Sequence, residues 1–152
     1  MMAKGAKKTP KVALFLGIVV GMLVGLGGYT FWYGRGYSYF SDDPAACVNC
    51  HVMRDSFNSW GVSSHRGVTC NDCHIPHSPV LKYAAKLENG IHHSIAFTFE
   101  DVQVIRITPR NLQTLQQNCI RCHKPMVSLI LQGEQGLAIS CTRCHQGAGH
   151  VF

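Results

Sequence analysis

The stretch Cys70-Asn71-Asp72-Cys73-His74 has the form C-x-x-C-H, and the chain repeats this form three more times. All eight cysteines fall into these four pairs, and each pair is followed at once by a histidine: Cys47 and Cys50 with His51, Cys70 and Cys73 with His74, Cys119 and Cys122 with His123, Cys141 and Cys144 with His145. C-x-x-C-H is the attachment pattern of c-type haem, in which two thiols bind one porphyrin edge and the histidine reaches the iron. The sequence therefore predicts four covalently bound c-type haems.

Zinc ribbons and disulfides are two other uses of closely spaced cysteines. Zinc ribbons contain C-x-x-C pairs but do not require a histidine directly after each pair. Disulfides in an oxidising compartment also leave the four histidines unexplained. Histidine makes up nine of the 152 residues, so four such placements by chance have a probability on the order of 1 in 10⁵. The pattern favours haem attachment.

An uncharged segment, VALFLGIVVGMLVGLGGYTFWY, covers residues 12–33. As a helix its 22 residues would measure about 33 Å, enough to cross a hydrocarbon core of about 30 Å. Aromatic residues gather at its far end, as in an interfacial belt, and Lys4, Lys7, Lys8 and Lys11 precede it. Lysines are enriched on the cytoplasmic side of membrane helices. We therefore expect residues 1–11 in the cytoplasm, a transmembrane helix over 12–33, and a periplasmic tetrahaem cytochrome c domain over 34–152, in a bacterial inner membrane.

A cleaved signal peptide is the alternative interpretation of this segment. Signal peptides have apolar regions of about 7–15 residues followed by a cleavage site with small residues. Here the apolar stretch is longer and ends in bulky aromatics, which favours a retained anchor. Gly17, Gly21 and Gly25 are spaced by four and form a ridge of the kind that packs helices together in membranes. This ridge is compatible with a homo- or hetero-oligomer.

The fold class follows from the low content of long periodic apolar runs after residue 33. We expect a mainly α chain with much irregular loop: one transmembrane helix plus a compact multihaem domain whose macrocycles form much of the core. Local helices are predicted over 79–90 and 111–132. Four of the fourteen basic residues precede position 12, and the other ten nearly balance the eight acidic residues. No basic stripe with interleaved aromatics remains, so no nucleic-acid partner is expected.

Haem iron also needs axial ligands, and four haems present eight axial positions. The motifs supply four histidines. The residues left as further ligands are His65, His77, His92, His93, His150, Met53 and Met126, and their spacing alone does not choose among them.

A basic N-terminus, one anchor helix and four C-x-x-C-H motifs resemble the NapC/NirT family of membrane tetrahaem cytochromes. The likeness covers essentially the whole chain. Cys47-Val-Asn-Cys50-His51-Val-Met53 resembles the CxxCHxM that opens the family's haem domain, and Ser64-His-Arg-Gly-Val-Thr-Cys70-Asn-Asp-Cys73-His74-Ile-Pro-His77 resembles its second motif. Within the family, the short tail with His150 five positions after His145 fits the small quinol-oxidising subunits of cytochrome c nitrite reductases.

The resemblance implies a ligand set. Met53 rather than His51 would bind the first iron, with His93 near its distal side, and a lysine from a partner would face His74 at the second haem. The third haem would pair His123 with His150, and the fourth would pair His145 with His65.

The resemblance also implies a quinol site beside the first haem, formed by the segment from Lys82 to His93. It assigns catalytic roles to Lys86, Asn89, His92 and His93. Asn89 stands where relatives carry aspartate, and His93 takes the place of a carboxylate. An imidazole suits proton uptake because its unperturbed pKa is near 6.5. The alternative for His92 and His93 is that both are surface residues at a helix end.

The implied function is a membrane-anchored quinol dehydrogenase that oxidises menaquinol and passes electrons to a pentahaem nitrite reductase catalytic subunit, which makes ammonium from nitrite. The chain has no haem motif with lysine in place of the last histidine, so it should not itself reduce nitrite. Three alternatives remain open: a donor to a nitrate, N-oxide or sulfoxide reductase, a multihaem terminal reductase, and a passive electron shuttle.

Overall fold

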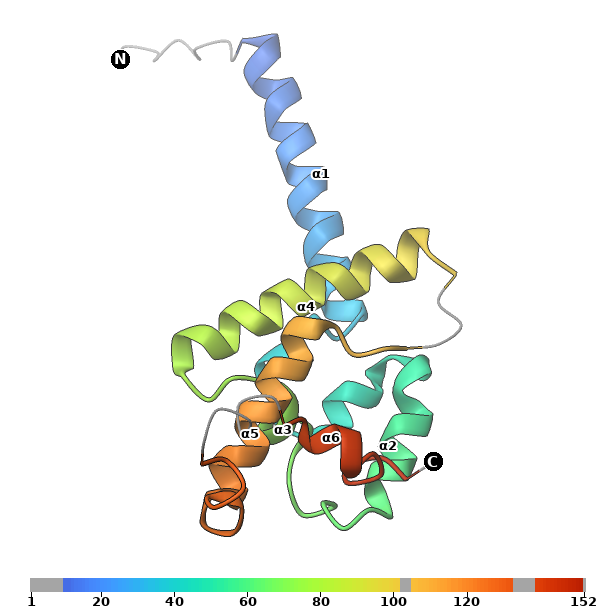
Figure 1. Cartoon of the computed structure of the whole chain (residues 1–152). Helices are drawn as coiled ribbons and strands as arrows, with labels where there is room; N and C mark the ends of the chain where they lie inside the picture. The colour runs from blue at the N-terminus through green and yellow to red at the C-terminus, as the bar shows by residue number, and fades with distance from the viewer. Residues whose placement is uncertain (1–9, 102–104, 133–138, 152) are drawn as a thin grey trace, which may run out of the picture. The chain divides into compact units, whose positions relative to one another are not determined.

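The computed structural model describes residues 10–101, 105–132 and 139–151, and these residues are mainly helical, with irregular loops and no strand among them (Figure 1). The mainly α fold class is confirmed. The predicted membrane orientation depends in part on three lysines that lie outside the described residues, Lys4, Lys7 and Lys8. The chain divides into two units, one ending at Ser38 and the other beginning at Tyr39.

The first unit consists mainly of α1, Lys11–Tyr33, which begins one residue before the predicted span and ends at the predicted residue. At 23 residues it is about 34 Å long. It is the one helix among the described residues with the length and apolar composition of a membrane span. The helix ends where the Gly34 amide donates to the Thr30 carbonyl and Arg35 adopts a left-handed backbone with φ of 50°.

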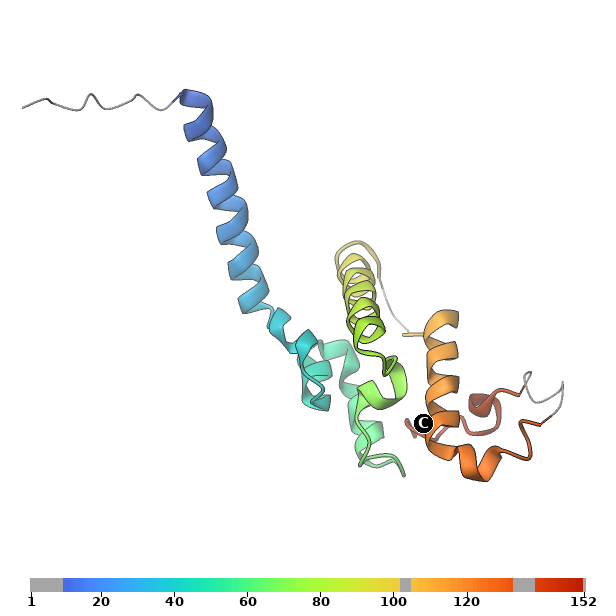
Figure 2. The ribbon, with the colours of Figure 1, turned by 90° about the vertical axis from the view of Figure 1, so that its left-hand side faces the viewer.

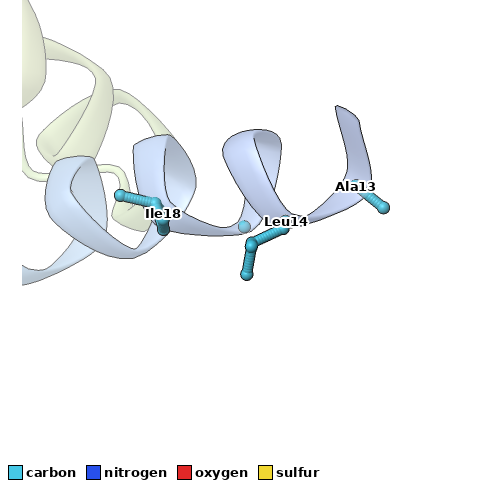
Figure 3. Close-up of a pocket in the computed structure, with 4 residues that line it drawn as sticks. Ala13, Leu14 and Ile18 are labelled. Carbon is cyan, nitrogen blue, oxygen red and sulfur yellow. The ribbon is translucent and has the colours of Figure 1, made fainter. Parts of the chain in front are cut away.

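A shallow apolar notch on α1 is lined by Ala13, Leu14, Gly17 and Ile18 (Figure 3). It exists because Gly17 has no side chain, and a Cβ added at Gly17, Gly21 or Gly25 would meet nothing within 4 Å. The predicted glycine ridge is therefore open in this chain.

The second unit contains the remaining elements, which follow a short 3-10 helix η1 (Gly36–Phe40) that runs across the unit boundary. In chain order these are the 3-10 helices η2 (Pro44–Asn49) and η3 (His51–Met53) and the α-helices α2 (Arg54–Gly61), α3 (Cys70–His74), α4 (Pro79–Phe99), α5 (Pro109–Val127) and α6 (Cys141–Cys144). Figures 1 and 2 show α5 and α6 side by side, where the Gln116 side chain bonds the backbone of Ile139 and Cys141.

The two long helices each begin at a proline, a residue well suited to the first helical position because it has no N–H to leave unpaired. Helix α4 starts at Pro79, as predicted, but continues nine residues past Gly90 to Phe99. Hydroxyls of Ser94 and Thr98 bond carbonyls one turn back rather than breaking the helix. Helix α5 begins at Pro109, with the Thr108 side chain capping Asn111, and ends at Val127, five residues short of the prediction.

The packing of α5 on α3 is the most extensive between helices of the described chain. Its centre is Asn118, whose buried amide donates to the carbonyls of Cys73 and Ile75 at 2.9 and 3.0 Å. Ile75 is the one buried hydrophobic side chain among the described residues. A polypeptide with so small a core of its own fits the expectation that large apolar groups complete it.

Candidate functional site

Each C-x-x-C-H motif lies on a turn of helix. The second motif is α3 itself, which is fixed by a capping box between Thr69 and Asp72. The third lies inside α5, the fourth begins α6, and the first straddles η2 and η3. Residues three apart on a helical turn share a face, so both thiols of a pair project to the same side. This arrangement suits attachment to one porphyrin edge.

The thiols of successive motifs lie close together. The Cys70 thiol donates a hydrogen bond to the Cys47 sulfur, which lowers the pKa of Cys47 to about 7 and raises the pKa of Cys70. Burial raises the pKa of Cys119, and the neighbouring Cys141 raises it further. None of the eight cysteines is in a disulfide and none is buried. The described residues form no cluster of three or more His, Cys, Asp or Glu of the kind that a zinc ribbon would need.

His65 and His150 are both held by the backbone. The Nδ1 atom of His65 lies 2.9 Å from the Ala148 carbonyl, and the Nδ1 atom of His150 lies 2.9 Å from the Ser56 carbonyl. A carbonyl can only accept, so Nδ1 donates and the neutral ring keeps its lone pair on Nε2. Metal-binding histidines are commonly oriented by such a bond from the other ring nitrogen. Both residues therefore fit an axial position.

Two pairs of histidine rings lie close together in the second unit, one pair edge-on and the other tilted. The centroids of His65 and His123 are 5.9 Å apart, and those of His74 and His150 are 6.1 Å apart. Two imidazoles on opposite sides of one metal ion have centroids roughly 6 Å apart when each metal–nitrogen bond is about 2 Å. The residues present thus fit haem ligation. These observed pairs differ from the ligand pairs that the resemblance implies. The resemblance pairs His145 with His65 and His123 with His150, and these two pairings stay a prediction.

The other candidate ligands are placed differently. The Nε2 atom of His77 lies 2.7 Å from the Arg121 guanidinium, a donor, and 3.2 Å from the Asp72 carbonyl, an acceptor, so this atom is already engaged within the protein. Met126 is 70% exposed. His51 is exposed and Met53 is half-buried at the end of η3. Ligation of the first iron by Met53 stays a prediction.

Lys86 is the predicted catalytic residue with the most distinctive surroundings. It is one of three buried polar residues in the described chain, with 7% of its surface exposed. Its ammonium donates to the Ser41 carbonyl at 2.7 Å and lies 3.3 Å from Asp42 Oδ1. The same ammonium helps to lower the pKa of Cys47. Lys86 therefore lies close to the attachment site of the first predicted haem.

The other predicted catalytic residues lie on the same continuous helix α4. Residues 86 and 93 are seven apart and share a face. His92 and His93 are both exposed. The Asn89 amide oxygen accepts from Asn111 of α5 at 3.1 Å, a bond that ties the two helices together. Asn89 is thus already engaged in packing.

Two residues beside this site were not predicted from the sequence. Asp42 accepts hydrogen bonds from Lys82 and Asn71, which are the main reasons that its pKa falls to about 2. Tyr39 packs so closely on α4 that a Cβ at Gly90 would lie 3.2 Å from its ring. Burial raises the pKa of Tyr39, and the thiols of Cys50 and Cys47 raise it further. Neither residue stands at a distinctive spacing from the first motif, so the sequence offers no signal that singles it out.

Comparison with known proteins gives a consistent result. The model of the "NapC/NirT cytochrome c family, N-terminal region" matches residues 7–105. The chain is 33% identical over 146 residues to the cytochrome c-type protein NrfH of Wolinella succinogenes, a match that covers 88% of this chain and 82% of the relative. It is 26% identical to the cytochrome c nitrite reductase subunit NrfH of Nitratidesulfovibrio vulgaris, over 74% of this chain and 70% of the relative.

A solved structure is also similar. It is that of the cytochrome c nitrite reductase NrfHA complex bound to the HQNO inhibitor, matched with a TM-score of 0.61 and 25% identity. The match covers 88% of this chain and 87% of that one.

Proposed function

The chain belongs to the NapC/NirT cytochrome c family, and we propose that it is a membrane-anchored quinol dehydrogenase. It takes electrons from menaquinol at the outer face of the cytoplasmic membrane and delivers them to a periplasmic pentahaem nitrite reductase. The similar NrfH of N. vulgaris is named as a nitrite reductase subunit, and the similar solved structure is a nitrite reductase complex. These likenesses support the partner.

The eight cysteines would attach four haems, which when bound accept and pass on single electrons. The motif histidines His74, His123 and His145 and the thioether of Met53 would each hold one iron. His65 and His150 would complete two of the coordination spheres, because a backbone carbonyl orients the ring of each through Nδ1.

The buried ammonium of Lys86 carries the proposal of quinol oxidation. A hydroquinone oxygen becomes anionic as it loses its proton, and a preorganised cation in a site shielded from water stabilises that charge. Lys86 is fixed by Ser41 and Asp42 and lies close to Cys47 of the first motif. An ammonium has three N–H donors, and among the described residues two of them have partners. The third can donate to the quinol.

Oxidation of one quinol also releases two protons. His93 lies on the same face of α4 as Lys86 and is exposed, so it can take a proton from the site and release it to solvent. His92 adjoins it and is also exposed. An imidazole is suited to both steps near neutral pH. With the basic N-terminus in the cytoplasm, these protons would be released on the periplasmic side.

Vesicles that contain menaquinol and the full-length, haem-loaded protein test this function. We expect menaquinol to reduce the haems of the wild type, as followed by visible absorbance. Lys86→Ala should slow this reduction by about 10²–10³-fold, the usual loss when such a donor is removed. Dithionite should still reduce every haem in the variant.

Lys124→Ala provides the matched control, because Lys124 is an exposed lysine in the last turn of α5. It should reduce at the wild-type rate. Full quinol activity in Lys86→Ala, with haem content intact, would contradict the proposed site.

The nearest alternative keeps this chemistry and changes the partner to a nitrate, N-oxide or sulfoxide reductase. Purification of the chain in detergent, followed by identification of the subunits that accompany it, separates these partners. A terminal multihaem reductase would need an iron open to its substrate. The orientation of both His65 and His150 for ligation favours a chain that carries electrons.

A further inference from the structure

We propose that Asp42 is a positioning residue for quinol oxidation: its carboxylate, held by Lys82 and Asn71, fixes the Lys86 ammonium beside the first haem-attachment site. The inference rests on the proposed function, because it assigns Asp42 a role through Lys86. Asp42 belongs to no C-x-x-C-H motif and lies five residues before Cys47.

Asp42 lies where three segments of the second unit meet. Its Oδ1 atom accepts from Asn71 Nδ2 at 2.6 Å and lies 3.3 Å from Lys86 Nζ, and its Oδ2 atom lies 2.5 Å from Lys82 Nζ. Asn71 belongs to the second motif, and both lysines belong to α4. The preceding carbonyl, that of Ser41, accepts from Lys86 and Asn71 as well. One short loop thus joins the second motif to the predicted quinol segment.

A buried lysine needs such a partner. Its four-carbon stem is flexible, and its ammonium is costly to remove from water unless it is paired and hydrogen-bonded. Lys86 has only 8% of its side chain exposed, whereas the side chain of Asp42 is 50% exposed and that of Lys82 is 25% exposed. The carboxylate and the Ser41 carbonyl therefore limit the positions that the Lys86 ammonium can occupy.

The distribution of contacts leaves Lys86 able to act on a ligand. Hydrogen bonds from Lys82 and then Asn71 are the largest causes of the low pKa of Asp42, about 2, so this carboxylate stays ionised wherever the protein works. Lys82 approaches it more closely than Lys86 does. Two ammonium groups and one carboxylate leave a net charge of about +1 at the cluster, so it can still attract an anionic quinol oxygen.

A merely structural role for Asp42 is the competing explanation, since the same bonds hold three segments together. A double-mutant cycle separates the two roles, because residues that act through each other give non-additive losses. The measurement uses menaquinol vesicles and full-length, haem-loaded protein. It records the maximal rate of haem reduction, the quinol content at half-maximal rate, and haem content for Asp42→Asn, Lys86→Ala and the double variant.

We expect Asp42→Asn to lower the maximal rate about 10- to 100-fold, because displacement of a catalytic group by about 1 Å costs on the order of 10²-fold. Haem content and reduction by dithionite should be unchanged. The double variant should be no slower than Lys86→Ala alone. Asp42→Glu should recover most of the rate, since it restores a carboxylate at a half-exposed position where the longer side chain fits.

Glu100→Gln is the matched control, because it also neutralises an exposed carboxylate, at the end of α4 and outside the predicted quinol segment. It should behave as the wild type. A wild-type rate for Asp42→Asn beside an inactive Lys86→Ala would overturn the positioning role and leave the proposed function standing. Additive losses, or loss of haem from Asp42→Asn, would overturn it as well. An active Lys86→Ala would overturn the proposed quinol site itself.

Discussion

Replacing His150 by alanine should remove an axial ligand from one iron without detaching any haem. The Nδ1–H of His150 donates to the Ser56 carbonyl, which orients the ring in the way that metal-binding histidines are commonly oriented. The ring also lies 6.1 Å from that of His74, a distance that suits two imidazoles on one iron. None of the eight attachment cysteines is changed in this variant. His65→Ala is the equivalent change at the other oriented histidine.

The size of the effect follows from the number of motifs. With four haems, the loss of one distal imidazole converts about a quarter of the iron to a high-spin or water-ligated form. His65→Ala should convert another quarter, because its ring lies close to a different motif histidine, His123. The double variant should therefore convert about half of the iron and lose the low-spin bis-histidine signal of both haems.

Electron paramagnetic resonance of the oxidised protein measures this directly, and a pyridine haemochrome assay confirms that four haems remain. His77→Ala is the internal control. The Nε2 atom of His77 is engaged by Arg121 and the Asp72 carbonyl, so this variant should keep the wild-type spectrum. An unchanged spectrum for His150→Ala would refute the reasoning from the ring orientation and would remove the C-terminal tail from the ligand set.

A related experiment tests whether His150 shares an iron with His123 or with His74. In a background that lacks Cys119 and Cys122, and so lacks the third haem, His150→Ala should produce no further change if His150 pairs with His123, as the family resemblance implies. If His150 pairs with His74, as the closeness of the two rings indicates, the change should persist.

Three further predictions concern stability and membrane topology. Asn118→Ala should lower the free energy of unfolding by about 2 kcal/mol, because it removes two hydrogen bonds, to Cys73 and Ile75, at about 1 kcal/mol each. If circular dichroism at a matched scan rate showed an unchanged melting temperature, this prediction would be wrong. The folded-state pKa of Asp42 is about 2, below its usual 3.8. The contribution of the ionised carboxylate to the free energy of unfolding should therefore be present above about pH 4 and be lost as the pH falls through 2. A difference in unfolding free energy between wild type and Asp42→Asn that stayed constant down to pH 2 would contradict this expectation. Mass spectrometry should find residues 12–33 in the mature protein, and a chain beginning after residue 30 would show that the segment is cleaved.

Features that depend on neighbouring residues were predictable from the sequence. The extent of α1 was predicted to within one residue because an uninterrupted apolar run is a local property. The start of α4 was predicted because proline favours the first turn of a helix. The end of α4 was not, since the residues after Gly90 contain no strong helix breaker before Glu100. Boundaries without a local signal are set by packing.

Contacts between distant segments were outside the reach of such patterns. His77 remained a candidate ligand until the structure placed Arg121, 44 positions away, on its Nε2 atom. Asp42 attracted no notice because its partners lie 29, 40 and 44 positions away. A lone carboxylate before a motif has no distinctive spacing, and only the folded chain reveals what it binds.

The buried polar residues show how such contacts support the site. The described chain buries three polar residues, Ser63, Lys86 and Asn118, but only one hydrophobic residue, Ile75. Burying a polar group costs folding free energy unless the group is hydrogen-bonded. Each of these three residues forms a hydrogen bond at or next to a predicted functional residue. Ser63 accepts from the backbone of His65, Asn118 anchors the second motif to the helix that carries the third, and Lys86 binds the loop that leads into the first. In a chain whose own apolar core is so small, polar bonds at these three points set the positions of the motifs relative to one another. Changes at these residues should therefore alter ligation or quinol oxidation before they reduce the helix content.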